Sequence, residues 1–160
     1  MTDHNSKEGI AAFTEAVKEA KEQFESVLQI AVLKISEGFH CIVTIKVDGK
    51  AARMILDTAA SGTIFDKKRF NKLVKNAVIT NNISKATTAA GEVEQARVDI
   101  KELKMDKLVL NDYTVVLMDL AHINDSYKAH KLQPIDGVIG ADILVKHKAI
   151  IDLSEKELVF

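Results

Sequence analysis

The chain has almost no cysteine, proline or tryptophan, and these shortages exclude whole classes of protein. Of its 160 residues, one is a cysteine, one is a proline and none is a tryptophan. A single thiol, Cys41, excludes an intramolecular disulfide framework and any zinc site built from several cysteines. An excess of one charge is also lacking, because 22 Lys and Arg residues stand against 23 Asp and Glu residues. That balance gives no reason to expect nucleic acid or an anionic membrane as a partner.

Long apolar runs and an apolar leader are missing too. No unbroken apolar run exceeds four residues, so the sequence predicts no membrane-spanning helix. Residues 1–8 are polar and charged where a secretory signal needs an apolar stretch. We therefore expect a cytoplasmic chain. Its length and its 47% of apolar residues indicate one folded domain with its own core.

The first segment has the pattern of an amphipathic helix. Asn5 and Glu8 match a capping box, an arrangement that begins many helices. Apolar residues then recur every three or four positions and form one stripe: Ile10, Phe13, Val17, Ala20, Phe24 and Val27. The stripe fits a helix packed on its own domain, which we favour, or a short coiled coil. We expect a helical extension over residues 1–28 and the main domain over residues 29–160.

The main domain is predicted to be mainly β, with many short strands. Asp48 and Gly49 stand between two strand-like runs and are a strong hairpin signal, because both residues of such a turn need a positive φ. We expect a second hairpin over residues 83–100, with its tip at residues 89–92, and a third over residues 108–118 that turns at Asn111 and Asp112. Regular hairpins of this kind predict a closed or folded-over sheet.

Shorter elements complete the predicted domain. Residues 66–75 have the pattern of a short helix, and a second short helix is expected from Ala141. Residues 119–133 show no strong period and are expected to form a loop. Residues 149–160 are expected to form a last pair of strands.

One predicted strand ends at a carboxylate, Asp57, that is followed by a run of small residues. Asp57 directly follows an apolar strand and precedes Thr58, Ala59, Ala60 and Ser61. A buried aspartate costs free energy unless it is hydrogen-bonded, paired or functional. Small neighbours let backbone N–H groups, or a second copy of the loop, approach the carboxylate closely. The ordinary alternative is an aspartate that caps the turn after it.

A second motif lies near the other end of the chain. Residues 136–142 read Asp-Gly-Val-Ile-Gly-Ala-Asp, so an apolar strand passes between Gly137 and Gly140, where backbones must crowd. These glycines are a weak signal alone. The three features in this order, the Asp57 segment, a glycine-tipped hairpin and then these glycines, form a specific signal.

Together these motifs resemble the retropepsin-like aspartic peptidases, the single-domain relatives of pepsin, and most of all their bacterial members. Residues 57–61 match the family's Asp-Thr-Gly-Ala-Ser loop, and Val138, Ile139 and Gly140 match its hydrophobic-hydrophobic-Gly support. Ala90 and Gly91 stand where the family has the tip of its flap. The resemblance covers residues 29–160 and implies a closed β-barrel or sandwich, half of a pepsin-type molecule.

The resemblance also implies a function. Asp57 would be the catalytic carboxylate, Thr58 would join hydrogen bonds across two subunits, and Gly91 would let the flap bend over an extended peptide. The family mechanism needs two aspartates that share one proton, and this chain supplies one. A homodimer is therefore implied, and the apolar C-terminal run Leu158-Val159-Phe160, which would otherwise form an exposed edge, is expected to take part in it.

One departure from the family pattern keeps an alternative open. Ala59 stands where the family has glycine, so a dimeric module that binds peptides without cutting them remains the second interpretation. No metal and no cofactor are expected, because the five histidines are scattered without a convincing ligand spacing.

Overall fold

The computed structural model describes residues 6–77, 79–88 and 91–160. As predicted, the chain is mainly β. Its strands are β1 (Val27–Gln29), β2 (Ala31–Ile35), β3 (Gly38–Val47), β4 (Lys50–Leu56), β5 (Ile64–Asp66), β6 (Ile79–Thr88), β7 (Gly91–Met105), β8 (Leu108–Met118), β9 (Gly137–Ile139), β10 (Ile150–Asp152) and β11 (Glu157–Val159). Its helices are α1 (Lys7–Phe24), α2 (Phe70–Leu73), α3 (Ala121–Ala129) and α4 (Ala141–Lys146).

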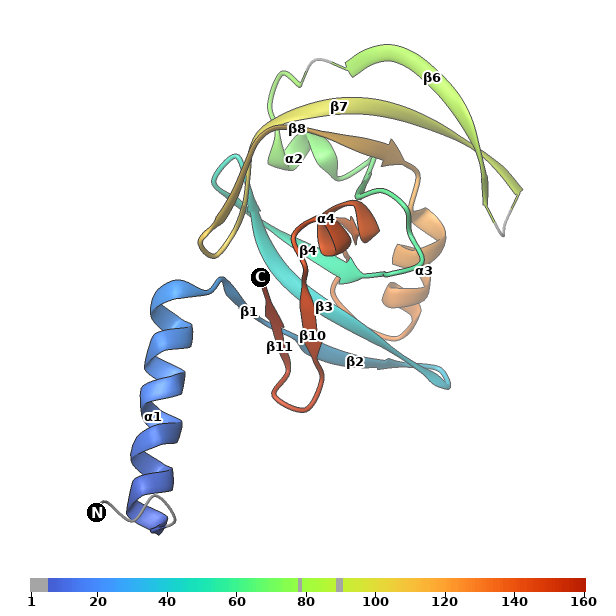
Figure 1. Cartoon of the computed structure of the whole chain (residues 1–160). Coiled ribbons are helices and arrows are strands. Elements are labelled where there is room, and N and C mark those ends of the chain that lie inside the picture. The colour runs from blue at the N-terminus through green and yellow to red at the C-terminus, as the bar shows by residue number, and fades with distance from the viewer. Residues whose placement is uncertain (1–5, 78, 89–90) are drawn as a thin grey trace.

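Most strands belong to one eight-stranded sheet that folds over on itself (Figure 1). Its order is β2-β3-β4-β9-β5-β8-β7-β6, and β3 also pairs with β7. The pairing of Val47 with Leu103 brings these distant parts of the sheet together. A second sheet, β1-β11-β10, pairs the first strand with the last two. The predicted folded-over sheet is therefore confirmed.

The core lies inside the folded sheet and is made by alternate residues of its strands. On β3, the side chains of Val43, Ile45 and Val47 are buried, and the polar residues between them are exposed. Phe65 and Phe70 pack edge to face, with ring centres 5.7 Å apart. Burial of each such side chain contributes about 1.5–3 kcal/mol to the stability of the fold.

Two of the three predicted hairpins are confirmed. Asp48 and Gly49 turn between β3 and β4 with φ values of 47° and 81°. The second hairpin, β6–β7, is longer than expected and pairs Thr88 with Gly91 at its end. Residues 89–90 of its predicted tip lie outside the described residues.

The third predicted hairpin is wrong, because β8 runs without a turn through Asn111 and Asp112. The register of β8 with β7 is the same on both sides of Asp112, which takes a φ of 50° inside the strand. The turn lies earlier, at Asp106, whose φ is 56°. Asn and Asp tolerate a positive φ within a strand as well as in a turn, so their presence alone misplaced the turn.

The segment predicted as a loop over residues 119–133 contains helix α3. The Asp119 carboxylate accepts the backbone N–H of Ala121 at 2.8 Å, at the start of this helix, and that hydrogen bond is the first cause that lowers the pKa of Asp119. Tyr127 is the one residue of α3 that is fully buried. A helix that buries one large side chain has a weak apolar period, which is why periodicity did not predict it.

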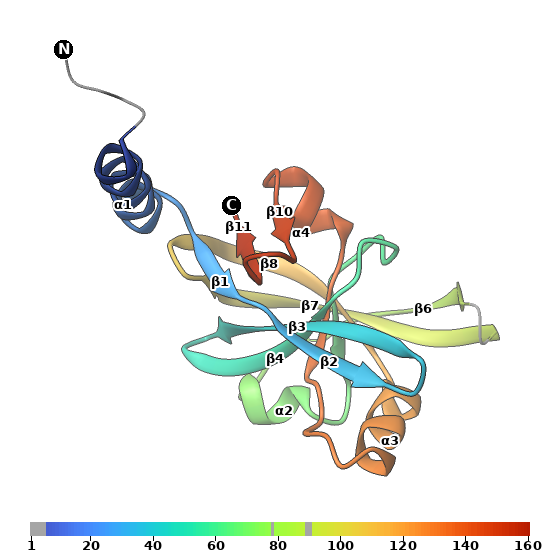
Figure 2. The same cartoon turned by 90° about the horizontal axis from the view of Figure 1, so that it is seen from below.

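Helix α1 projects away from the β domain (Figures 1 and 2), so the favoured expectation of a helix packed on its own domain is wrong. Residues 11–20 are all exposed, including Phe13 at 72%. Asn5 lies outside the described residues; in the part described, the Ser6 hydroxyl accepts the N–H of Gly9 at the helix start. None of the described helices is both long and apolar enough to cross a membrane.

The C-terminal strand is another correction. Leu158 and Val159 are 0% and 5% exposed, because β11 lies between β1 and β10 in the three-stranded sheet. Val27 pairs with Val159 on one side, and Ile150 pairs with Val159 on the other. The expected exposed edge at β11 is thus covered within the chain, and the two edges of this sheet belong to β1 and β10.

Candidate active site

Asp57 lies directly after β4, where two apolar strands run parallel. Ile55 pairs with Val138 and Leu56 with Ile139. One residue further, the N–H of Asp57 donates to the carbonyl of Ile139 at 3.0 Å. Strand β9 therefore holds the backbone of Asp57 at the end of the pairing, and leaves its side chain half-buried.

The loop after Asp57 turns back on the carboxylate. The N–H of Ala59 donates to Asp57 Oδ1 at 2.9 Å, and the N–H of Ala60 donates to the Asp57 carbonyl at 3.2 Å. Oδ1 of Asp57 therefore caps the turn after it, as the ordinary alternative in the sequence analysis expects. No hydrogen bond from a described residue reaches Oδ2, which stays available for other chemistry. Thr58 and Ser61 are exposed on the same loop.

Ala59 fits the loop without backbone strain. It is not among the described residues that take a positive φ, so the methyl group imposes no conformational penalty. Its side chain is exposed and faces the cavity described below.

The segment around Gly140 contacts the Asp57 loop and holds it in place. The N–H of Ala141 donates to the Ala60 carbonyl at 2.7 Å. A Cβ atom on Gly140 would lie 2.5 Å from the Gly62 carbonyl oxygen, and one on Gly137 would lie 2.2 Å from the Ile64 oxygen. The backbone crowding predicted for these two glycines is therefore present, and it leaves no room for any side chain.

A partly buried series of hydrogen bonds, which the sequence did not predict, reinforces the contact. Thr63 Oγ1 accepts the N–H of Gly140 at 3.2 Å and donates to Asp142 Oδ1 at 2.8 Å. The hydroxyl of Tyr113, on β8, donates to Asp142 Oδ2 at 2.7 Å. Burial, and then the Asp142 carboxylate, raise the pKa of Tyr113, which keeps the phenol protonated as a donor. These hydrogen bonds therefore connect β8 to the loop that carries Asp57.

The start of β9 is fixed by a second, separate network. The carboxylate of Asp136 accepts the backbone N–H of Arg53 at 2.8 Å and the Nε–H of Arg69 at 2.8 Å. Asp136 is 7% exposed, so its charge needs these donors. This network holds β9 against β4 at the end of β9 opposite to Asp57.

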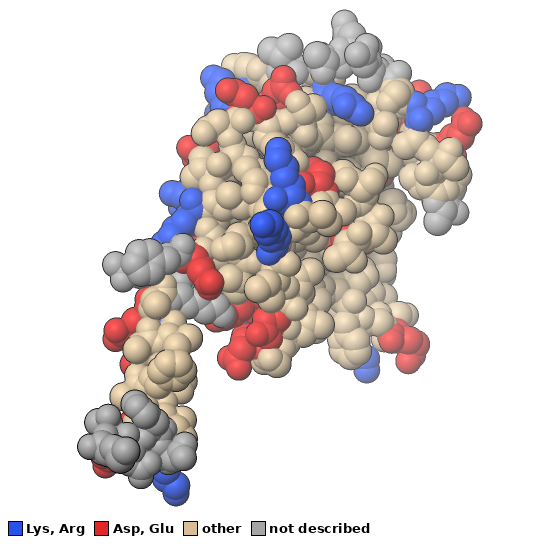
Figure 3. All heavy atoms as spheres, viewed as in Figure 1, with Lys and Arg blue, Asp and Glu red and all other residues tan. Residues whose placement is uncertain are grey.

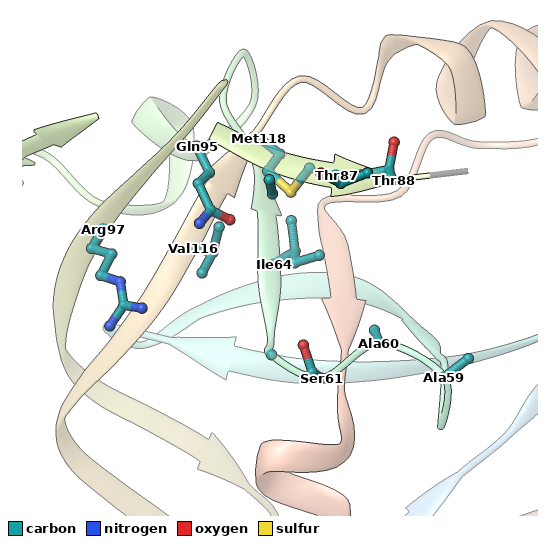
Figure 4. Close-up of a pocket in the computed structure, with 12 residues that line it drawn as sticks. Ala59, Ala60, Ser61, Ile64, Thr87, Thr88, Gln95, Arg97, Val116 and Met118 are labelled. Carbon is teal, nitrogen blue, oxygen red and sulfur yellow. The ribbon is translucent and has the colours of Figure 1, made fainter. Parts of the chain in front are cut away.

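A cavity of about 470 Å³ separates the loop from the β6–β7 hairpin (Figure 4). The loop residues Ala59, Ala60 and Ser61 lie on one side of it, and Thr87 and Thr88 lie on the other. Asp57 is not among the residues that line it. The full lining consists of Ala59, Ala60, Ser61, Gly62, Ile64, Ala86, Thr87, Thr88, Gln95, Arg97, Val116 and Met118. This is a mixed polar and apolar space next to a carboxylate.

A sequence model of the aspartyl protease family matches residues 43–143, more than half of the chain. The chain belongs to the aspartyl protease family. The matched residues include the Asp57 loop, the β6–β7 hairpin and the Gly140 segment, so the match spans all the motifs that carry the resemblance. The family and the fold support a peptidase in general terms.

Solved structures agree on the fold of this aspartyl protease. The EIAV protease in complex with the inhibitor HBY-793 matches with a TM-score of 0.54 and 16% identity, over 76% of this chain and 100% of that one. A retropepsin-like aspartic protease from Rickettsia conorii matches with a TM-score of 0.53 and 17% identity, over 85% of this chain and 98% of that one. A search of curated protein sequences finds no match. The predicted retropepsin-like fold is confirmed, and the bacterial subtype stays a prediction.

The tip of the predicted flap in this aspartyl protease is described only in part. Gly91 takes a φ of 110°, which disfavours any residue with a side chain, although open space surrounds its Cα. Ala90 lies outside the described residues. The hydroxyl of Thr88 donates to the Gly91 carbonyl at 3.0 Å across the hairpin end. Gly91 therefore has a backbone conformation that favours glycine, and its role in a flap stays a prediction.

Charge and metal-ligand clusters point to no second site on the part of the chain that the structure describes. In the face shown in Figure 3, positive and negative side chains are interspersed without a continuous patch of one sign. Within the described ranges, no group of three or more His, Cys, Asp or Glu side chains is placed to hold a metal ion. The Asp57 loop is thus the candidate site that the fold, the motifs and the cavity have in common.

Proposed function

We propose that this aspartyl protease is an endopeptidase that acts as a homodimer on extended peptide segments, with Asp57 of each subunit as the catalytic carboxylate. The observation that carries the proposal is the single Asp57 loop, suspended from a single Gly140 segment. The chemistry of this family needs two carboxylates within hydrogen-bond distance. A two-fold axis beside the loop would supply the second carboxylate from an identical chain.

The proposed mechanism uses the two carboxylates as base and acid. One ionised carboxylate takes a proton from a water molecule, whose oxygen attacks the scissile carbonyl carbon. The other carboxylate, which carries the shared proton, donates it to the carbonyl oxygen, and a tetrahedral diol forms. The carboxylate that received the water proton then donates it to the amide nitrogen, while the other carboxylate takes a proton from a diol hydroxyl; the C–N bond breaks, and the amine and the new carboxylic acid leave. The Ala59 N–H orients Oδ1 of Asp57, which leaves Oδ2 for proton transfer.

The substrate would lie in the cavity between the loop and the β6–β7 hairpin. β6 is the last strand of the eight-stranded sheet, so one row of its backbone groups has no neighbouring strand in that sheet. An extended peptide can pair with such an edge through main-chain hydrogen bonds. Ile64, Val116 and Met118 would provide apolar contact for its side chains.

The proposed subunit contact uses β10 rather than the buried β11. Ile150 on β10 and Leu153 after it are 61% and 56% exposed, and Val145 on α4 is 74% exposed. Helix α4 begins at Ala141, whose N–H holds the Asp57 loop. An apolar contact at these residues would therefore be continuous with the site that it completes.

The second interpretation, a module that binds peptides without cutting them, gains no support. It rested on Ala59 in place of glycine, and the backbone at Ala59 takes a conformation that suits alanine. The boundary between residues 1–28 and 29–160, the cytoplasmic location, and the absence of a cofactor and of nucleic acid stay predictions.

The test is cleavage of a peptide library by the full chain, read by mass spectrometry, together with the mass of the particle in solution. Asp57→Asn keeps the shape of the side chain and removes the titrating group, so we expect turnover to fall at least about 100-fold with the fold retained. Asp125→Asn, the same change at an exposed position on α3, serves as the matched control and should cleave like the wild type. Undiminished cleavage by Asp57→Asn, or by a strict monomer, would overturn the proposal.

A further inference from the structure

Helix α1 presents an apolar stripe that nothing in the described chain covers. Ile10, Phe13 and Val17 are 55%, 72% and 51% exposed, although water-exposed side chains of this size have no reason to share one face. The 18-residue helix extends from the domain over about 27 Å, because each residue adds about 1.5 Å. The stripe is therefore a contact surface without its partner.

The pattern of the stripe favours a second helix as the partner. Ile10 and Val17 are seven residues apart, and Phe13 stands between them at the second seam position of a heptad. The residues that flank the seam between Ile10 and Val17 are small and uncharged, namely Gly9, Thr14 and Ala16, and the next flanking position is Lys21. The Thr14 hydroxyl is satisfied within the helix, because it donates to the Ile10 carbonyl at 2.8 Å. A narrow seam with small flanks suits close helix–helix packing better than packing on a broad sheet.

The charges of the helix argue against a membrane as the partner. Its outer face carries Lys7 and Lys18 but also Glu8, Glu15 and Glu19. An amphipathic helix that lies on an anionic membrane needs an excess of Lys and Arg on its polar face. This face has none.

The position of the helix points to a second copy of the same chain. α1 joins the three-stranded sheet directly, since β1 follows after two residues. The joint is held by the N–H of Phe160, which donates to the Ser26 carbonyl at 3.0 Å, and Ser26 is buried. Figure 2 shows α1 on the same side of the molecule as β10, β11 and α4. A copy docked through β10 and α4 would therefore bring its own α1 to the same side.

We propose that α1 pairs with α1 of a second copy in a short two-stranded coiled coil, with Ile10, Phe13 and Val17 in the seam. This rests on the proposed function, because the pair of helices would assist the dimer that completes the site. A coiled coil this short is marginal alone. Linked to a second contact at β10 and α4, it raises the effective concentration of one half-site near the other and strengthens the dimer.

The experiment measures the dissociation constant of the dimer by sedimentation, using the full chain. Phe13→Glu places a charge in the seam, whereas Ala11→Glu places the same charge on the opposite face. We expect Phe13→Glu to raise the dissociation constant at least about tenfold, and Ala11→Glu to leave it within about twofold of the wild type. Cleavage by Phe13→Glu should fall at low protein concentration and recover at high concentration, because the Asp57 loop is unchanged.

The outcomes separate this inference from the proposed function. Equal dissociation constants for both variants, with cleavage intact, would overturn the helix pairing and leave the peptidase proposal standing. Dimers weakened by Phe13→Glu in a chain that cleaves nothing would support the pairing and overturn the peptidase proposal. A wild-type chain that stays monomeric at all concentrations would overturn both.

Discussion

The two sides of the cavity use glycine for opposite reasons. Gly140, behind the Asp57 loop, has an ordinary φ of −98°, but a Cβ there would lie 2.5 Å from a carbonyl oxygen. Gly91, at the hairpin end, has a φ of 110° and open space around it. One glycine is required by space and the other by backbone conformation. The backbone on the loop side is thus tightly packed, while the backbone at the hairpin end has open space around it.

The largest effect should come from adding one carbon to the crowded side. Gly140→Ala would force a methyl group into the Gly62 and Ala60 carbonyls, which belong to the backbone and cannot rotate away. We expect a loss of about 3 kcal/mol or more in the free energy of unfolding, or failure to fold. Urea unfolding of the purified variant measures this loss.

Gly91→Ala is the matched control on the open side. It meets no neighbouring atom, so its cost is the conformational one, about 1–2 kcal/mol. If Gly91→Ala proved more destabilising than Gly140→Ala, the contrast between the two sides would be wrong.

A smaller effect is expected when the hydrogen-bond chain behind the loop loses one member. Tyr113→Phe removes a donor to the Asp142 carboxylate, at about 2 kcal/mol, since hydrogen bonds to charged groups are the stronger ones. The loop then loses part of its support, and errors of position slow catalysis, so turnover should fall about 2–10-fold with KM nearly unchanged. Hydrogen exchange at the Ala141 N–H should quicken in parallel.

Tyr127→Phe is the control for this prediction. The Tyr127 hydroxyl forms a hydrogen bond with His40 Nδ1 at 2.7 Å, away from the loop, and burial raises its pKa to about 12. Its loss should cost about 1 kcal/mol and leave turnover alone. Equal turnover in the two variants would show that the Tyr113 hydrogen bond serves stability only.

The smallest effect is expected at Ala59, on the face of the loop toward the cavity. Ala59→Gly removes a methyl group from the wall where a peptide would pass, so turnover should rise a few-fold, roughly 2–5 times, through better positioning. Stability should drop by less than about 1 kcal/mol, because glycine also loosens the unfolded chain. Peptide kinetics and urea unfolding of the same sample test both parts; a fall in turnover would contradict the first.

The sequence was informative where local chemistry decides the structure. Asp48 and Gly49 turn because of their own backbone preferences, and Gly137 and Gly140 stand where only glycine fits. The Asp57 loop could be proposed as a site because its residues, the glycine-tipped hairpin and the Gly140 motif occur in the order that the retropepsin-like family has. The turn at Asp48 and Gly49 needs no knowledge of distant neighbours, whereas the atoms that crowd Gly137 and Gly140 belong to Ile64 and Gly62, far away along the chain.

Prediction from the sequence failed where residues distant along the chain determine the structure. The donors to Asp142 come from Thr63 and Tyr113, far away along the chain, and no spacing predicts such a meeting. The stripe of α1 has the same pattern whether it faces its own domain or solvent, so periodicity could not choose between them. Whether residues 158–160 formed an edge depended on β1 and β10, which cover them.

The long connection between the loop and its support also has a consequence for timing. Thr63 and Gly140, whose hydrogen bond helps to hold the loop, are 77 residues apart. At roughly 5–20 residues per second, a ribosome needs roughly 4–15 s to make the second partner after the first. Until then the nascent chain has Asp57 and the local hydrogen bonds of its loop, but not the support from the Gly140 segment. The proposed active site therefore cannot form until most of the chain has been synthesised.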